Sequence, residues 1–246
     1  MRHASIGGAP GLALVLLLLG AGQAAAQQAF VDACVNESNP KFEIEACTRV
    51  IEIWGAETVG IAWAFYHRGN AYVAQENYDR AILDYDAAIK LKPDHAHAYA
   101  DRGLAYFGKG AFERAIEDYD QAIRLDPTYP ATYQDRCYSL AILGHAERGL
   151  ADCNKALAMS PKDPIFLDSR GYAYLRLGEL DKALADYKAA LRGHPFFDTS
   201  LFGSAVAYAA KGDRAQAAHD LKAARSINPK IDQQMKRVRL TAPAGL

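Results

Sequence analysis

The chain has 246 residues, half of them hydrophobic, and its 28 basic and 29 acidic side chains give a formal net charge of −1. The hydrophobic content excludes a disordered chain, and the length allows one or two compact domains or one elongated repeat array. The near-neutral charge excludes the broad basic surface expected of a protein that binds nucleic acid or an anionic membrane.

The N-terminal residues 1–26 have the order of a cleavable export signal. Arg2 precedes an unbroken apolar run from Leu12 to Leu19, and small residues follow at Ala24 and Ala26. This order predicts a signal peptide cut after Ala26 and export to the periplasm or the medium, with no stable membrane anchor afterwards. The alternative is an uncleaved anchor, which is disfavoured because the run is much shorter than the roughly 20 residues that span a bilayer.

Residues 27–61 predict a degenerate helical hairpin at the front of the fold. Helices are expected at Gln28–Asn36 and Phe42–Trp54, joined by the sequence Glu-Ser-Asn-Pro-Lys. A short connector, Gly55–Gly60, follows the second of them.

From residue 62 to residue 229 the sequence repeats itself with a step of 34 residues. In the first copy Phe65, Gly69 and Tyr72 have helical spacing, and a second helix is indicated by Ala81 and Tyr85. A turn separates the two helices, and a proline ends each copy because it cannot continue a helix. The small residue of the first helix recurs as Gly69, Gly103, Cys137, Gly171 and Ala205, and the final proline as Pro93, Pro127, Pro161, Pro195 and Pro229.

The residues of the first two copies closely resemble the tetratricopeptide repeat (TPR). The first copy reads Arg-Gly-Asn-Ala-Tyr at 68–72 and Tyr-Asp-Arg-Ala-Ile at 78–82, and the second reads Arg-Gly-Leu-Ala-Tyr at 102–106. The resemblance implies an all-α solenoid of five helix-turn-helix repeats whose first helices line a concave groove. The repeats would span 62–95, 96–129, 130–163, 164–197 and 198–231, and residues 230–246 would form a short capping helix and a frayed tail.

Four cysteines in an exported protein favour disulfide bonds. Cys137 replaces the first-helix glycine of the third copy and Cys153 replaces its second-helix aromatic residue, so the two face each other within one hairpin. Cys34 and Cys47 lie one on each helix of the front hairpin. We therefore predict the pairs Cys34–Cys47 and Cys137–Cys153; the alternative is four buried thiols that pack as small hydrophobic side chains.

The sequence contains no motif for a catalytic nucleophile, a phosphate-binding loop or a zinc protease, so no catalytic residue, metal or cofactor is expected. An arginine precedes the first-helix small residue in four copies, and an aspartate precedes the second-helix residue that faces it in all five. These charges could form a ligand-binding row, but because they follow the repeat we predict a structural ladder of hydrogen bonds between helices. The residues are Arg68, Arg102, Arg136 and Arg170, with Asp84, Asp118, Asp152, Asp186 and Asp220.

By the resemblance, partner binding belongs to the variable residues of the first helices, and these are largely aromatic, as protein interfaces are. The alternative for Leu104, Val206 and Ala209 is packing between neighbouring first helices. Asn70 matches an asparagine that holds a terminal carboxylate in some TPR proteins, but the accompanying lysines are missing. The predicted partner-binding residues are Trp63, Tyr66, Asn70, His97, Phe107, Gln134, Tyr138, Asp168, Tyr172 and Phe202.

These features together predict a non-catalytic interaction module or scaffold in the periplasm that binds an unidentified peptide or protein. The alternative is a structural or envelope-assembly protein that acts by self-association of the array.

Overall fold

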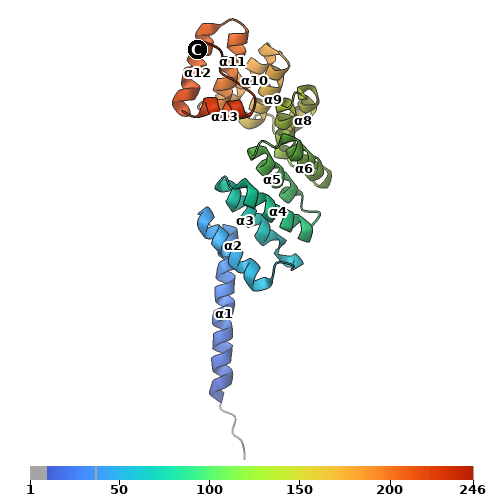
Figure 1. Cartoon of the computed structure of the whole chain (residues 1–246), viewed down its shortest axis with the longest axis vertical. Helices are drawn as coiled ribbons and strands as arrows, with labels where there is room; N and C mark the ends of the chain where they lie inside the picture. Colours follow the sequence, from blue (N-terminus) through green and yellow to red (C-terminus); the bar gives the residue numbers. More distant parts are fainter. Residues whose placement is uncertain (1–9, 37, 246) are drawn as a thin grey trace, which may run out of the picture. The chain divides into compact units, whose positions relative to one another are not determined.

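The computed structural model describes residues 10–36 and 38–245 and is all-α (Figure 1). These residues form thirteen α-helices and one short 3-10 helix, with no β-strand among them. The predicted fold class is therefore confirmed. The helices fall into two compact units that divide between Pro93 and Asp94, after the first copy of the repeat.

The first unit contains the predicted front hairpin and the first helix pair. Its elements are α1 (Pro10–Asn36), α2 (Pro40–Trp54), the 3-10 helix η1 (Val59–Ile61), α3 (Ala62–Ala74) and α4 (Tyr78–Leu91). Helix α2 begins where Pro40 presets the backbone and the Asn39 side chain accepts a hydrogen bond from the Lys41 backbone N–H.

Helix α1 begins at Pro10 instead of the predicted Gln28, so it continues through the predicted cleavage point. Residues 1–9 of the predicted signal segment lie outside the described residues. Among the described helices, none combines the length and the apolar character needed to cross a membrane.

The second unit contains four further helix pairs and a short last helix. The pairs are α5 (Ala96–Gly108) with α6 (Phe112–Leu125), α7 (Pro130–Ile142) with α8 (Ala146–Met159), α9 (Pro164–Arg176) with α10 (Leu180–Gly193), and α11 (Asp198–Ala210) with α12 (Arg214–Ile227). The first helices of the five pairs, counted over both units, begin at residues 62, 96, 130, 164 and 198. These starts are 34 residues apart, which is the step of the sequence repeat. Helix α13 (Ile231–Arg237) lies beside α11 and α12, within the residues 230–246 that were expected to form a short capping helix and a tail (Figure 1).

The turns inside the pairs require a left-handed backbone. Gly110, Gly144, Gly178 and Gly212 have φ angles of 79°, 90°, 75° and 86°, which glycine adopts without a steric penalty. The first copy has Glu76 at this position with φ 55°. Each second helix ends two residues before its proline, as the sequence predicts.

Within each pair the two helices approach closely at the small residue of the first helix. A Cβ atom on Gly103 would lie 2.7 Å from Cε1 of the Tyr119 ring, and a Cβ atom on Gly69 would lie at the same distance from Cε1 of the Tyr85 ring. The tyrosine ring therefore occupies the space that any larger first-helix side chain would need.

Candidate protein-interaction surface

The repeated arginines and aspartates form the predicted structural ladder. Arg68, Arg102, Arg136 and Arg170 each donate two hydrogen bonds from a first helix to an aspartate on the second helix of the same pair, at 2.6–2.8 Å. In the fifth pair Ser204 replaces the arginine and donates to Asp220. Such two-pronged ion pairs fix geometry, and here their charges are occupied within the fold.

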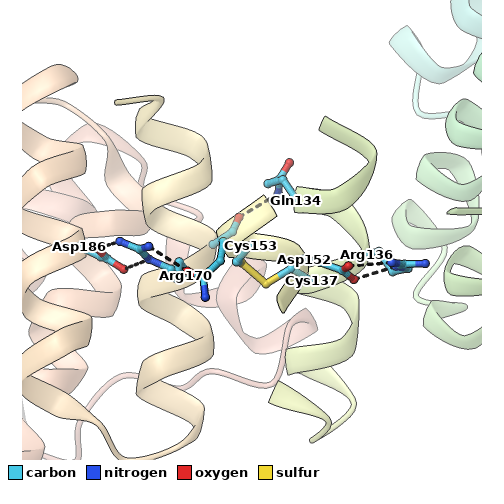
Figure 2. The surroundings of a disulfide bond; sticks show 9 residues. Gln134, Arg136, Cys137, Asp152, Cys153, Arg170 and Asp186 are labelled. Atoms are coloured by element: carbon cyan, nitrogen blue, oxygen red, sulfur yellow. Dashed lines mark hydrogen bonds and ion pairs between the residues drawn. A yellow bond between two sulfur atoms is a disulfide. The ribbon is translucent and has the colours of Figure 1, made fainter. Parts of the chain in front are cut away.

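The same guanidinium groups also tie successive pairs together in the second unit. Arg136 donates a third bond to Asp120 on α6, and Arg170 donates one to Asn154 on α8. Figure 2 shows the Arg136–Asp152 and Arg170–Asp186 pairs on either side of a disulfide. The ladder therefore stabilises the stacking of pairs and offers no open row of cations.

Both predicted disulfides are present. Cys34 on α1 bonds to Cys47 on α2, and Cys137 on α7 bonds to Cys153 on α8, with Cα atoms 4.7 Å and 5.5 Å apart. All four side chains are fully buried or nearly so. The second bond (Figure 2) takes the place of the glycine–tyrosine contact found in other pairs.

In the first unit, the predicted residues Trp63 and Tyr66 keep part of their rings exposed. Trp63 contacts Trp54 edge-on with ring centres 6.2 Å apart, and His67 lies between Trp63 and Tyr66 at 6.3 Å and 5.5 Å. We call Trp54, Trp63, His67 and Tyr66 the aromatic row. Burial lowers the pKa of His67, which favours its neutral ring.

Asn70 follows the residues of the aromatic row on α3, and its side chain is used within the fold. Its side-chain oxygen accepts a hydrogen bond of 2.6 Å from the buried Tyr85 hydroxyl. An amide used in this way is less available to hold the terminal carboxylate of a partner.

In the second unit the predicted residues divide into an open and a covered group. His97 is exposed and its ring lies 5.1 Å from that of the exposed Tyr129, while Leu104 on the same helix is 41% exposed. Phe107 packs against Phe112 on α6 and Tyr138 on α7, at 5.2 Å and 5.8 Å between ring centres. Of the predicted partner-binding residues in the second unit, the exposed one is therefore His97 on α5.

Tyr172 and Phe202 belong to the covered group, and the end of the chain contributes to their cover. Tyr138 is partly buried, and its ring centre lies 4.8 Å from that of Tyr172. Tyr172 and Phe202 are 1% and 0% exposed and share one apolar cluster with Val238 and Leu240. The Tyr172 hydroxyl donates a 2.5 Å hydrogen bond to the carbonyl of Val238. The sequence gives no direct sign of this cover beyond the two apolar residues that follow the last helix.

The predicted polar residues Gln134 and Asp168 tie neighbouring first helices together. Gln134 on α7 donates to the Ser169 hydroxyl on α9 at 2.8 Å, and Asp168 on α9 accepts from Ser200 on α11 at 2.5 Å. Burial raises the pKa of Asp168 to about 6, and burial together with the charge of Asp101 raises the pKa of Asp135 to about 7.

No cluster of three or more histidine, cysteine or acidic side chains suited to a metal ion occurs within residues 10–36 and 38–245. Six buried aspartates are held by side chains of neighbouring helices, namely Asp84, Asp118, Asp152, Asp168, Asp186 and Asp220. The predicted partner-binding residues that keep part of their surface exposed include the ring side chains Trp63, Tyr66 and His97, which is chemistry for contact with another molecule.

Comparison with known proteins gives the family. The model of the tetratricopeptide repeat matches residues 66–130, 139–196 and 169–230, which together cover more than half of the chain. No curated protein matches the sequence.

Solved structures share the fold at low sequence identity. A tetratricopeptide repeat protein from Parabacteroides merdae is 15% identical, with a TM-score of 0.69 over 87% of this chain and 90% of its own. TTC0263, a TPR protein of Thermus thermophilus, is 23% identical, with a TM-score of 0.61 over 72% and 97%. YrrB, described as a TPR protein with an unusual peptide-binding site, is 24% identical, with a TM-score of 0.57 over 80% and 100%. The repeat match, the helix pairs and these neighbours agree, and the chain belongs to the tetratricopeptide repeat family.

Proposed function

We propose that the protein is a non-catalytic interaction module of the periplasm that binds a peptide or protein segment through exposed side chains of its first helices. The observation that carries the proposal is the aromatic row of the first unit. Trp54 is 42% exposed, and Trp63 and Tyr66 are partly exposed beside it. Large amphipathic rings of this kind are the side chains that most often anchor a protein interface.

Export is supported by two independent features of the chain. The N-terminal residues have the charged, apolar and small-residue order of a signal peptide. Both disulfides also fit an oxidising compartment, because such bonds are rare in the reducing cytosol.

A binding role also agrees with what TPR proteins generally do. YrrB, which shares the fold, is described as having a peptide-binding site. In this chain four buried carboxylates serve the fold, since Asp84, Asp118, Asp152 and Asp186 are all held by arginines. This use of the carboxylates supports a non-catalytic role.

The test is affinity capture from a periplasmic extract with the protein and two variants. The Trp54→Ala/Trp63→Ala variant removes two rings of the row, and Leu83→Ala removes an apolar side chain that is 68% exposed on the second helix α4. We expect one protein to be retained by the wild type and by Leu83→Ala but lost by the double variant, with folding of each checked by circular dichroism.

Equal capture by all three proteins, or none by any, would show that the row is not the working surface. Sedimentation velocity over a range of concentrations addresses self-association. An association that the double variant abolishes would identify a second copy of this chain as the partner.

A further inference from the structure

Residues at the end of the chain lie against the first helices of the pairs in the second unit, as a bound peptide would. Helix α13 is anchored in the core by Ile231 and Met235, which are 0% and 4% exposed. We call residues 238–245 the C-terminal segment. Val238 and Leu240 of this segment are buried, at 9% and 7% exposed.

The two apolar side chains belong to a cluster that includes residues of the first helices α7, α9 and α11. Tyr172 on α9 and Phe202 on α11 belong to this cluster, and Tyr138 on α7 is partly buried and packs against it. Arg239, between the two, donates from its guanidinium to the carbonyl of Ile142 at the C-terminal end of α7. A cation at that end of a helix is favoured by the unpaired carbonyls there.

The protein holds the segment largely through its backbone. The Tyr172 hydroxyl donates to the carbonyl of Val238, and Arg176 donates to the carbonyl of Arg239 at 3.1 Å. Arg214 donates to the carbonyl of Gly245 at 3.2 Å. Contacts with main-chain oxygens do not depend on the side chains of the segment, so they are available to any peptide whose backbone follows the same path.

The segment can leave without disturbing the helix pairs. Each pair is closed by its own contacts, such as the Arg170–Asp186 bonds of α9 with α10, and the segment takes no part in these. Its departure would expose Tyr172 and its hydroxyl to an incoming chain.

We propose that the surface beneath the C-terminal segment is a second peptide site, and that the segment is a resident ligand which a partner must displace. The fitting partner is a short segment with two apolar side chains separated by one residue, preferably a basic one. This inference rests on the proposed function and extends it, because it assigns a class of ligand to the first helices that the C-terminal segment covers.

The test measures binding of fluorescent peptides by anisotropy. The open variant is the full chain with Val238→Ser/Leu240→Ser, and the matched control is Ile227→Ser, which removes an apolar side chain that is 40% exposed on α12. The first peptide has the sequence of residues 236–245, Lys-Arg-Val-Arg-Leu-Thr-Ala-Pro-Ala-Gly. A second peptide carries Ile-Lys-Ile in place of Val-Arg-Leu, and a third carries Ser-Arg-Ser.

We expect the open variant to bind the first two peptides at least about tenfold more tightly than the wild type or Ile227→Ser does, since a tethered segment competes at an effective concentration on the order of 1 mM. The Ser-Arg-Ser peptide should not bind. Adding Tyr172→Phe to the open variant should weaken binding several-fold, because one donor to the peptide backbone is lost.

Three results would overturn the proposal. The first is equal binding by the wild type and the open variant, and the second is no binding by a folded open variant. The third is binding of the native peptide but not of the Ile-Lys-Ile peptide, which would mean that the surface accepts only the protein's own segment. If the open variant does not fold, hydrogen exchange of the wild type decides. Amides of residues 238–245 should exchange far faster than those of α11, and equally slow exchange refutes a displaceable segment. The synthetic peptides give an answer whether or not the aromatic row captures a partner.

Discussion

Asp168→Asn should change how the stability of the protein depends on pH. Asp168 is buried on α9 and accepts hydrogen bonds from Ser200 and Thr199 on α11. Burial is the main cause of its raised pKa of about 6, and the nearby charge of Asp198 adds to it. Asparagine has nearly the same shape and can still accept the Ser200 bond, but it has no proton to release.

The sign follows from which state holds the proton. Between pH 3.8 and about 6 the folded protein keeps the Asp168 proton that the unfolded chain has already released. The free energy of unfolding therefore falls as the pH rises through this window. At ~1.4 kcal/mol per pH unit, the interval is worth about 3 kcal/mol, and the asparagine variant should lack this loss.

The assay is urea unfolding, followed by circular dichroism, at several pH values from 3.5 to 7.5. The free energy of unfolding of Asp168→Asn minus that of the wild type should rise by about 3 kcal/mol across the range. Asp94→Asn, at an exposed position of the same unit, controls for the change of charge alone. A difference that stays constant with pH, or that falls as the pH rises, would refute the assignment of a buried, proton-binding carboxyl.

Three further changes test the packing. The pair Cys137→Ser/Cys153→Ser should lower the free energy of unfolding by about 3 kcal/mol in urea titrations, because the bond closes a loop with a sequence separation of 16; four free thiols in the unfolded, unreduced wild type would contradict both bonds. Gly103→Ala should cost roughly 1–3 kcal/mol in the same assay, since its Cβ would lie 2.7 Å from the Tyr119 ring, whereas Gly60→Ala meets no atom within 4 Å and a similar cost there would refute the steric reason. Arg136→Lys should lower the thermal midpoint more than Arg170→Lys, because Arg136 joins two aspartates and Arg170 joins one aspartate and an asparagine; the reverse order would count against the ladder.

The fold could be predicted because the repeat constrains each position several times. The close approach of the two helices is one example, since the sequence gives three chemical solutions to it. Four pairs place a glycine or an alanine beside a larger side chain, as in Gly103 with Tyr119 and Ala205 with Leu221. The third pair joins Cys137 to Cys153 instead. Because these two exceptions fall on facing positions of one hairpin, the repeat that predicted the helices also predicted this disulfide.

The candidate site was harder to predict, because the repeat register says which face a residue lies on but not what covers it. Gln134 and Asp168 occupy predicted groove positions, yet both are buried and bonded to hydroxyls on the first helix of the next pair. The register also missed Trp54, which follows no repeat and lies against Trp63. Contacts made by residues outside a repeat are not encoded in its period.

The first-helix positions of the two units differ in what they leave exposed, and solvation explains the difference. Phe202, which has no polar atom, is fully buried in the cluster that contains Val238 and Leu240. The aromatic row instead uses Trp, His and Tyr rings, whose polar edges tolerate water. A large apolar patch left open would favour aggregation, so the second unit needs a cover. By this reasoning the C-terminal segment keeps the second unit soluble in the absence of a partner, and the first unit can present its rings continuously.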